Sequence, residues 1–213
     1  MAGAKKARRG PPSAVTADSA APALAELKLF HDGGGRNENF SFTRAYWAEG
    51  HERESMSGRI DRKVHPVRSA TGEILASAAT IDLVLPLDAP QEYMCLNHLI
   101  RRYEETLPKH EVNAYAQVTI RFPGTANLIE PFEMVRAWVR SHFTHVPVLV
   151  VLHAPHLWGS SNPGHCHCIA WPRRANFLGW AEIERTIASD AGQREAYDSW
   201  LAFQEIWRHA QGR

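Results

Sequence analysis

The chain has 213 residues, of which 44% are hydrophobic, and its formal net charge at pH 7 is +1. A chain of this size can bury the core of one ordinary domain, and its apolar content excludes disorder throughout. No run reaches the ~20 apolar residues of a membrane span, so membrane insertion is not expected. Three cysteines do not make a disulfide framework, and a charge this close to zero does not by itself indicate nucleic-acid binding.

Residues 1–24 are rich in Ala, Pro, Ser, Lys and Arg and show no hydrophobic periodicity. This composition predicts a disordered basic tail, and residues 25–213 are expected to form the folded domain. The basic residues near the N-terminus are not followed by the apolar core of a signal peptide. We therefore expect a cytoplasmic protein.

The sequence of the first part of the domain predicts two strands, which are separated by a helix and a mobile segment. A short strand, LKLFHD at residues 27–32, ends at the flexible sequence GGGRN. A helical pattern starts at Phe42 and carries Tyr46 in its first turns, and the polar residues 56–71 are expected to be a mobile excursion. Alternating apolar residues in ILASAATIDLVLP, residues 74–86, predict a half-buried strand that ends at its proline.

The second part predicts alternating helices and strands. The expected elements are a helix from Pro90, a strand over residues 112–122, a helix over residues 130–143, two strands that carry histidines, and helices around Trp180 and over residues 196–210. One face of the strand over residues 112–122 is apolar, and the other is expected to face solvent or a ligand. This order predicts an α+β fold, a five-stranded, mainly antiparallel sheet with helices packed on one face.

Residues 152–174, LHAPHLWGSSNPGHCHCIAWPRR, read as a strand that enters a turn-rich loop and returns as a second strand. Residues two apart on a strand point to the same face, so His165 and His167 project together. If the strands pair as a hairpin, His153 lies alongside them, and His156 competes with it for that place. Three converging imidazoles would form a metal site, whereas the alternative is that they are ordinary hydrogen-bonded histidines.

Several neighbouring polar residues allow two interpretations. Cys166 and Cys168 alternate with the histidines and are expected to be small buried residues rather than ligands. Asp82 could orient a ligand imidazole, or it could be a solvent-facing residue at a sheet edge. Arg173 and Arg174 could contact DNA phosphate beside the metal, or they could be surface charges.

The order of these motifs resembles the MobA/MobL family of plasmid mobilisation relaxases, which belong to the HUH endonucleases. The resemblance covers residues 27–174, and its landmarks are RAYWAEG, IDLVLPLDAP, VTIRFP and VVLHAPHLWGSSNPGHCHCIAWPRR. It implies an HUH relaxase-like fold. It also implies a site- and strand-specific nuclease that nicks a plasmid transfer origin and forms a covalent 5′-phosphotyrosine intermediate.

The resemblance assigns roles to individual residues. Tyr46 matches the family's nucleophile, and His153, His165 and His167 match the ligands of a divalent metal ion, with Mg²⁺ or Mn²⁺ expected. The family's common form is Asn-Pro-His-x-His, whereas here Gly164 precedes the first histidine of the pair. The implied partners are single-stranded or locally melted origin DNA, accessory mobilisation proteins and a coupling protein.

The chemistry agrees with this resemblance, because a metal held by neutral imidazoles can stabilise the charge that develops on a phosphoryl group. Two other functions stay open. A rolling-circle replication initiator or a transposase of the same superfamily would use a tyrosine after the histidine pair, and Tyr197 is the one available. A catalytically silent DNA-binding relative would keep the fold alone.

Overall fold

The structure is a computed structural model, and it describes residues 24–31, 37–48 and 52–212. The predicted basic tail lies outside the described residues, except for its last residue. Among the described helices, none combines the length and the hydropathy of a membrane span.

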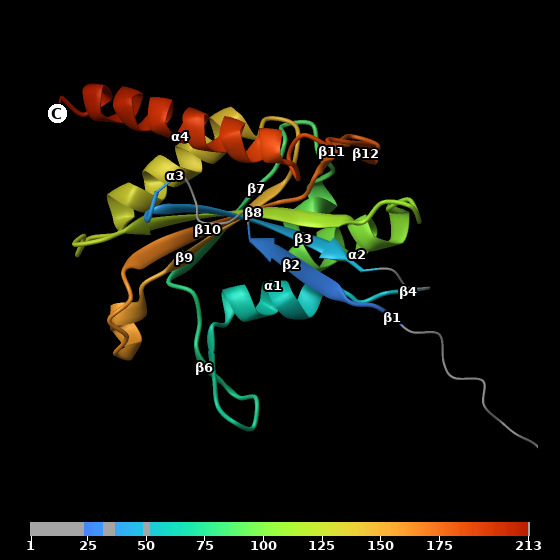
Figure 1. Ribbon diagram of the computed structural model, residues 1–213, viewed down its shortest axis with the longest axis horizontal. Helices are drawn as coiled ribbons and strands as arrows, with labels where there is room; N and C mark the ends of the chain where they lie inside the picture. Colours follow the sequence, from blue (N-terminus) through green and yellow to red (C-terminus); the bar gives the residue numbers. More distant parts are fainter. Residues whose placement is uncertain (1–23, 32–36, 49–51, 213) are drawn as a thin grey trace, which may run out of the picture.

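The fold is built on a sheet of six strands in the order β2-β3-β8-β10-β9-β7, with every neighbouring pair antiparallel (Figure 1). Strands far apart in sequence are neighbours, since β3 pairs with β8 and β7 pairs with β9. The strands are β2 Leu27–His31, β3 Phe40–Trp47, β7 Thr80–Val84, β8 Asn113–Phe122, β9 Val148–His153 and β10 Gly164–Ala170. The predicted α+β class and antiparallel sheet are confirmed, with six strands in place of five.

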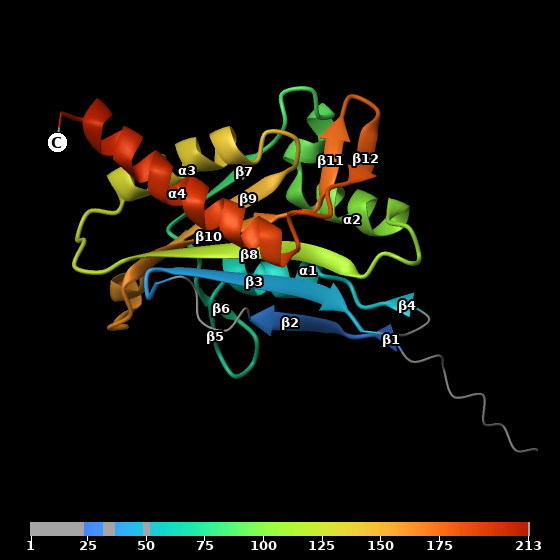
Figure 2. The same ribbon diagram turned by 45° about the horizontal axis from the view of Figure 1, so that its top comes forward.

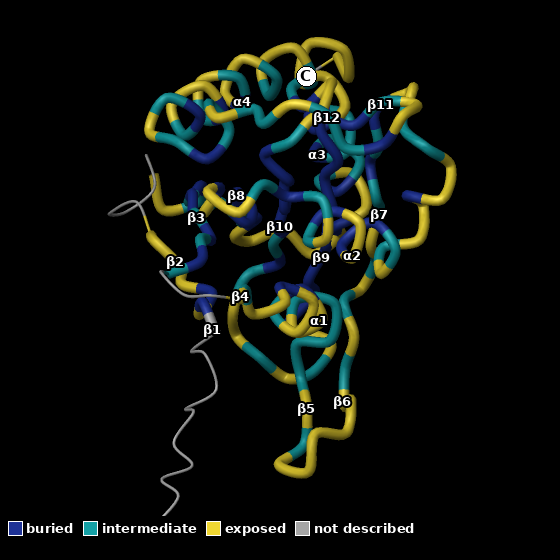
Figure 3. Tube along the Cα trace, turned by 90° about the vertical axis from the view of Figure 1, so that its right-hand side faces the viewer, coloured by how far each residue is buried: buried dark blue, intermediate teal, exposed yellow. Residues whose placement is uncertain are grey.

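Helices cover both faces of this sheet, whereas the sequence predicted helices on one face only (Figure 2). On one face, α3 (Ile129–His142) and α4 (Asp190–Ala210) pack through Trp138 and Trp200. On the other face, α1 (Ser57–Val64) and α2 (Leu96–Thr106) pack over a second core. The central strands are therefore buried on both sides, which Figure 3 shows as dark blue runs along β9 and β10.

Smaller elements connect this framework. They are two 3₁₀ turns and three two-stranded pairs: η1 Gln91–Met94, η2 Pro155–Trp158, β1 Leu24–Ala25 with β4 Glu52–Arg53, β5 Val67–Arg68 with β6 Ile74–Ala76, and β11 Arg173–Asn176 with β12 Gly179–Ile183. The helix predicted around Trp180 is wrong, because that segment is the β11–β12 hairpin.

The helix predicted from Phe42 is also wrong, because residues 40–47 form β3. Phe42 and Ala45 are both buried and three residues apart, which imitates helical spacing. They belong to different cores, Phe42 to the one under α4 and Ala45 to the one under α1. A strand that is covered on both faces buries residues of both parities, so its period of two is hidden in the sequence.

The mobile excursion predicted over residues 56–71 is an ordered part of the fold instead. It contains α1, whose Ile60 is buried against the sheet. The start of the helix is fixed by Glu104 of α2, because the Met56 backbone N–H donates to Glu104 Oε1 at 2.7 Å. Contacts of this kind join distant segments, and a local pattern does not reveal them.

Near the start of helix α4, the backbone of the preceding turn lies so close to position 192 that only glycine fits there. A Cβ atom there would lie 2.1 Å from the Thr186 carbonyl oxygen and 2.7 Å from that of Ile187, and both are backbone atoms. We expect Gly192→Ala to lower the free energy of unfolding by about 1–3 kcal/mol, because the backbone has to shift. Thermal unfolding followed by circular dichroism measures this change.

Gly58→Ala is the matched control, because Gly58 lies in α1 with nothing within 4 Å of its added Cβ. It should be neutral or stabilising by up to ~1 kcal/mol, since alanine favours the helix. Equal melting temperatures for the two variants would contradict the packing argument.

Candidate metal centre

Three histidines converge on the sheet face that α1 covers. His153 ends β9, and the strand register places it directly opposite His165 of β10, with His167 two residues further along. Their ring centroids are 4.9–5.0 Å apart, and one ligand atom from each lies within 4.8 Å of the others. The pairing predicted from the sequence is thus the one that the structure shows.

The outer nitrogens of two of these rings are held by backbone oxygens. His153 Nε2 lies 2.6 Å from the carbonyl oxygen of Lys63, and His165 Nδ1 lies 2.9 Å from that of Pro163. A carbonyl oxygen only accepts, so each ring donates from its outer nitrogen, and a neutral ring then has its lone pair on the inner nitrogen. The inner nitrogens, His153 Nδ1 and His165 Nε2, lie 3.1 Å apart, where two lone pairs repel unless a cation lies between them.

The third ring is held by a side chain. His167 Nδ1 lies 2.9 Å from Thr119 Oγ1, on the neighbouring strand β8. Gln117 Nε2 donates to the same hydroxyl at 3.1 Å, and a hydroxyl oxygen can accept both hydrogen bonds. This leaves His167 Nε2 directed toward the other two inner nitrogens.

Burial keeps these imidazoles neutral near pH 7. It lowers the pKa of His153 to about 4 and holds the pKa of His167 well below its ordinary value, and in both rings the nearby positive charges act in the same direction. Burial also lowers the pKa of His165. Neutral imidazoles are the form that binds metal ions.

The donor set fits a divalent metal ion. Three imidazoles with fixed outer hydrogen bonds are typical of metal ligands, whose second nitrogen is usually bonded to an oxygen that orients the ring. Nitrogen donors suit zinc and neighbouring transition metals more than Mg²⁺, which prefers oxygen. His153, His165 and His167 would hold the ion.

His156, the competing candidate for the first ligand, does not belong to the cluster. It is exposed in η2, the turn that follows β9. Trp158 of the same turn lies against His153, with ring centroids 6.4 Å apart. Cys166 and Cys168 point to the opposite face of β10, are fully buried in the core under α3, and have thiol pKa values raised by burial.

The structure does not bring Tyr46 to the histidines. Tyr46 lies in β3, five residues beyond Ser41, and Ser41 is level with Thr119 and so with His167. Five residues of a strand span roughly 16 Å. Tyr46 also alternates with Ala45 of the core under α1, so its side chain projects from the opposite face of the sheet.

The other four tyrosines make their contacts away from the three histidines, and the described residues contain all five tyrosines of the chain. Tyr197 of α4 packs edge-on against Phe40, on the face away from the histidines. Tyr115 lies on the histidine face but four residues before Thr119, roughly 13 Å along β8. Tyr103 donates to the backbone of residue 113, and Tyr93 packs against the indole of residue 180.

Asp82 does not orient a ligand imidazole. Its carboxylate accepts a hydrogen bond from Arg136 Nε at 2.6 Å and lies 3.4 Å from Arg140 Nη2, both in α3. This places it on the face of the sheet opposite to the histidines. Thr119 and two backbone carbonyls hold the imidazoles instead.

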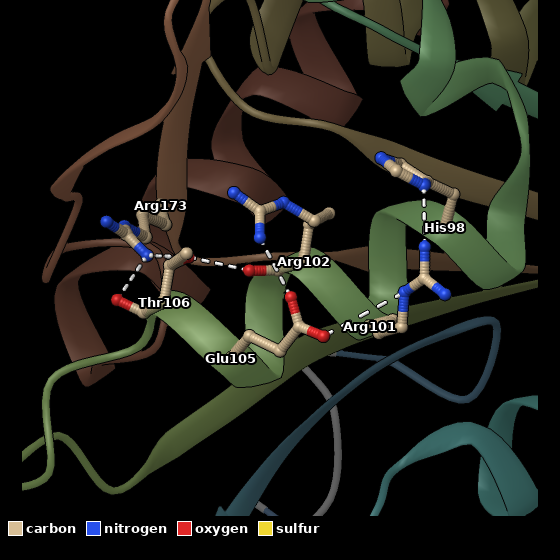
Figure 4. A network of polar contacts seen from close by, with 6 residues as sticks. All are labelled: His98, Arg101, Arg102, Glu105, Thr106 and Arg173. Atoms are coloured by element: carbon tan, nitrogen blue, oxygen red, sulfur yellow. Dashed lines mark hydrogen bonds and ion pairs between the residues drawn. The ribbon is translucent and has the colours of Figure 1, made fainter.

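Arg173 and Arg174 do not lie beside the histidines either, because they follow the far end of β10. Arg173 donates to the carbonyl oxygens of Ala181 at 2.6 Å and Thr106 at 3.0 Å, and Figure 4 shows its contact with Thr106. Arg174 forms an ion pair with Glu184 at 2.8 Å. Both arginines fasten the β11–β12 hairpin rather than a ligand.

Three residues near the centre were not singled out from the sequence: Lys63, Thr119 and Arg121. Thr119 and Arg121 occupy the face of β8 that was expected to meet a ligand, so their alternation in VTIRFP was an available signal. Lys63 had only the weak signal of a basic cluster with Arg59, Arg62 and Arg68, and its helix was not predicted.

Comparisons with known proteins bear on the fold alone. No protein-family model and no curated protein matches the sequence. A solved structure reported as "Molecular Basis of Vancomycin Resistance Transfer in Staphylococcus aureus" superposes with a TM-score of 0.58 and 11% sequence identity, over 88% of this chain and 95% of that chain. The two chains share a fold, which is consistent with the HUH relaxase-like fold expected from the sequence.

The hydrogen bond from His167 to Thr119 predicts a measurable effect on metal binding. Thr119→Val keeps the shape of the side chain but removes the acceptor, so metal affinity should fall about 10–100-fold. Calorimetric titration with Zn²⁺ or Mn²⁺ measures it. Thr43→Val is the control, because Thr43 contacts His31 and none of the three ligands; an equal loss in both variants would count against the assigned role.

Acid should destabilise the metal-free protein. The pKa of His153 falls from an ordinary 6.5 to about 4 on folding. As the pH is lowered, the unfolded chain therefore binds a proton at this ring at a higher pH than the folded chain does. This ring does not reduce the free energy of unfolding above pH 6.5. As the pH falls toward 4, protonation of the ring in the unfolded chain lowers that free energy, by up to about 3 kcal/mol.

Thermal unfolding in the presence of a chelator, repeated across this pH range, tests the prediction. The acid-induced loss should shrink in His153→Gln and stay unchanged in His156→Gln, which alters an exposed ring. Identical pH profiles for wild type and His153→Gln would show that another group is responsible.

Proposed function

We propose that the protein is a metal-dependent, relaxase-type nuclease that cleaves one DNA strand at a plasmid transfer origin during mobilisation. The observation that carries this proposal is the cluster of three imidazoles with all outer nitrogens hydrogen-bonded. Its support from comparison is the fold shared with a structure reported for vancomycin resistance transfer in Staphylococcus aureus. The substrate would be single-stranded or locally melted origin DNA, delivered with accessory and coupling proteins.

The residues of the chain prepare this face of the sheet for a phosphodiester. In their neutral form the three histidines would hold the ion, which would supply Lewis-acid polarisation of the phosphate oxygens when bound. Thr119 and the carbonyls of residues 63 and 163 fix the ring orientations, so little rearrangement is needed when the substrate binds.

We do not assign Tyr46 as the nucleophile; in its place a water molecule would attack the phosphorus, and the oxygen of the neighbouring nucleotide would leave and take up a proton. A covalent 5′-phosphotyrosine would need its hydroxyl at the histidines, whereas the residue lies roughly 16 Å further along β3 and on the other face. Tyr197 lies on that other face as well, which argues equally against an initiator that would use it.

Strand cleavage of supercoiled and single-stranded origin DNA, with Mn²⁺ or Zn²⁺ added, tests the proposal. His167→Ala should abolish cleavage, because it removes a ligand, and Tyr46→Phe should leave the rate within about twofold, because the phenol takes no part. Gel analysis after protease treatment shows whether any product carries protein. A covalent adduct that Tyr46→Phe abolishes would overturn our exclusion of this residue.

A second candidate is a DNA-binding protein of the same mobilisation system that does not cleave. The position of all five tyrosines away from the centre favours it. Wild-type protein that takes up metal and binds origin DNA, but leaves every strand intact, would select this function over the first.

A further inference from the structure

Two positively charged side chains flank the three histidines, and neither has a role in the centre described above. Arg121 of β8 is the direct cross-strand partner of His165, so the two side chains share one face about 5 Å apart at Cβ. Its guanidinium is oriented by neutral groups, since Nη1 lies 3.2 Å from Ser41 Oγ and 3.4 Å from the Glu38 carbonyl oxygen.

Lys63 approaches the histidines from α1. Its carbonyl oxygen holds His153, so the residue is fixed at the edge of the cluster. The positive charge of its side chain lowers the pKa of all three rings, and Arg121 acts in the same way on His165 and His167. Lys63 is partly buried, and burial lowers its pKa.

Neither cation is neutralised within the described part of the chain. The ion pairs found there include no carboxylate bound to Lys63 or Arg121. The acid nearest to Lys63 in α1, Asp61, pairs with Arg68 instead. Two cations beside three neutral rings leave this face positive, and a divalent ion would make it more so.

We propose that Lys63 and Arg121, together with the three-histidine centre, bind one phosphodiester group of a DNA strand. Arg121 offers a planar fork that matches two phosphate oxygens, and Lys63 adds a point charge from α1. A partly buried ammonium without a counterion gains most from such a partner. This assignment rests on the proposed function for its substrate, and it concerns binding rather than cleavage.

Binding of dimethyl phosphate, a phosphodiester without bases, tests the site directly. Line broadening of its ³¹P resonance by Mn²⁺-loaded protein reports a phosphate next to the metal. Lys63→Met and Arg121→Met should each weaken binding about tenfold, because each removes a charged hydrogen-bond donor. Lys63→Arg should restore most of the affinity.

Two controls separate charge from structure. Arg62→Met makes the same change in net charge at an exposed position of the same helix, and its affinity for dimethyl phosphate should match wild type. The affinity for Mn²⁺ should stay constant or rise in Lys63→Met and Arg121→Met, because a neighbouring positive charge is lost. A merely structural role would lower metal affinity and melting temperature together.

The salt dependence of single-stranded DNA binding gives an independent measurement. The slope of log affinity against log salt should fall by about 0.7 for each of the two charges removed. Unchanged phosphate and DNA binding in both variants would overturn the proposal, as would an equal effect of Arg62→Met or a wild type that takes up no Mn²⁺. Phosphate binding through Lys63 and Arg121 without strand cleavage would leave this site standing and refute the nuclease instead.

Discussion

The candidate metal centre depends on the register between β9 and β10, which sets His153 opposite His165. A shift by one residue would turn both histidines of β10 to the other face and bring Cys166 and Cys168 in their place. The register is secured by burial on both faces, because each apolar side chain of β9 is enclosed by one of the two cores. Ordinary packing therefore fixes the ligand geometry, with no need for a dedicated loop.

The sequence was sufficient to predict this hairpin and its three histidines, since a period of two and a turn between two strands are local signals. It was not sufficient to predict α1. This helix is held in place by the hydrogen bond between Met56 and Glu104 and by the contact of the Lys63 carbonyl oxygen with His153, 90 residues away in the chain. The helix expected at Tyr46 failed for a different reason. Strand β3 is buried on both faces, so its apolar residues lose their alternation.

Polar residues that looked functional in the sequence mostly serve the fold. Asp82 pairs with α3, and Arg173 fastens a hairpin to α2. By contrast, two of the three groups that orient the imidazoles are backbone carbonyls, which every residue type carries. No pattern of residue types predicts such an acceptor, so this part of the site can be identified only from the folded structure.

At position 63 the main chain and the side chain act on the three histidines in different ways. The main-chain carbonyl oxygen at position 63 holds His153, while the side chain at the same position contributes positive charge, so a substitution there removes the charge and keeps the carbonyl oxygen. A lineage could exchange this lysine and change the charge beside the three histidines while keeping the carbonyl contact to His153. The orientation of His153 and the charge beside the three histidines can thus change separately at a single position of α1.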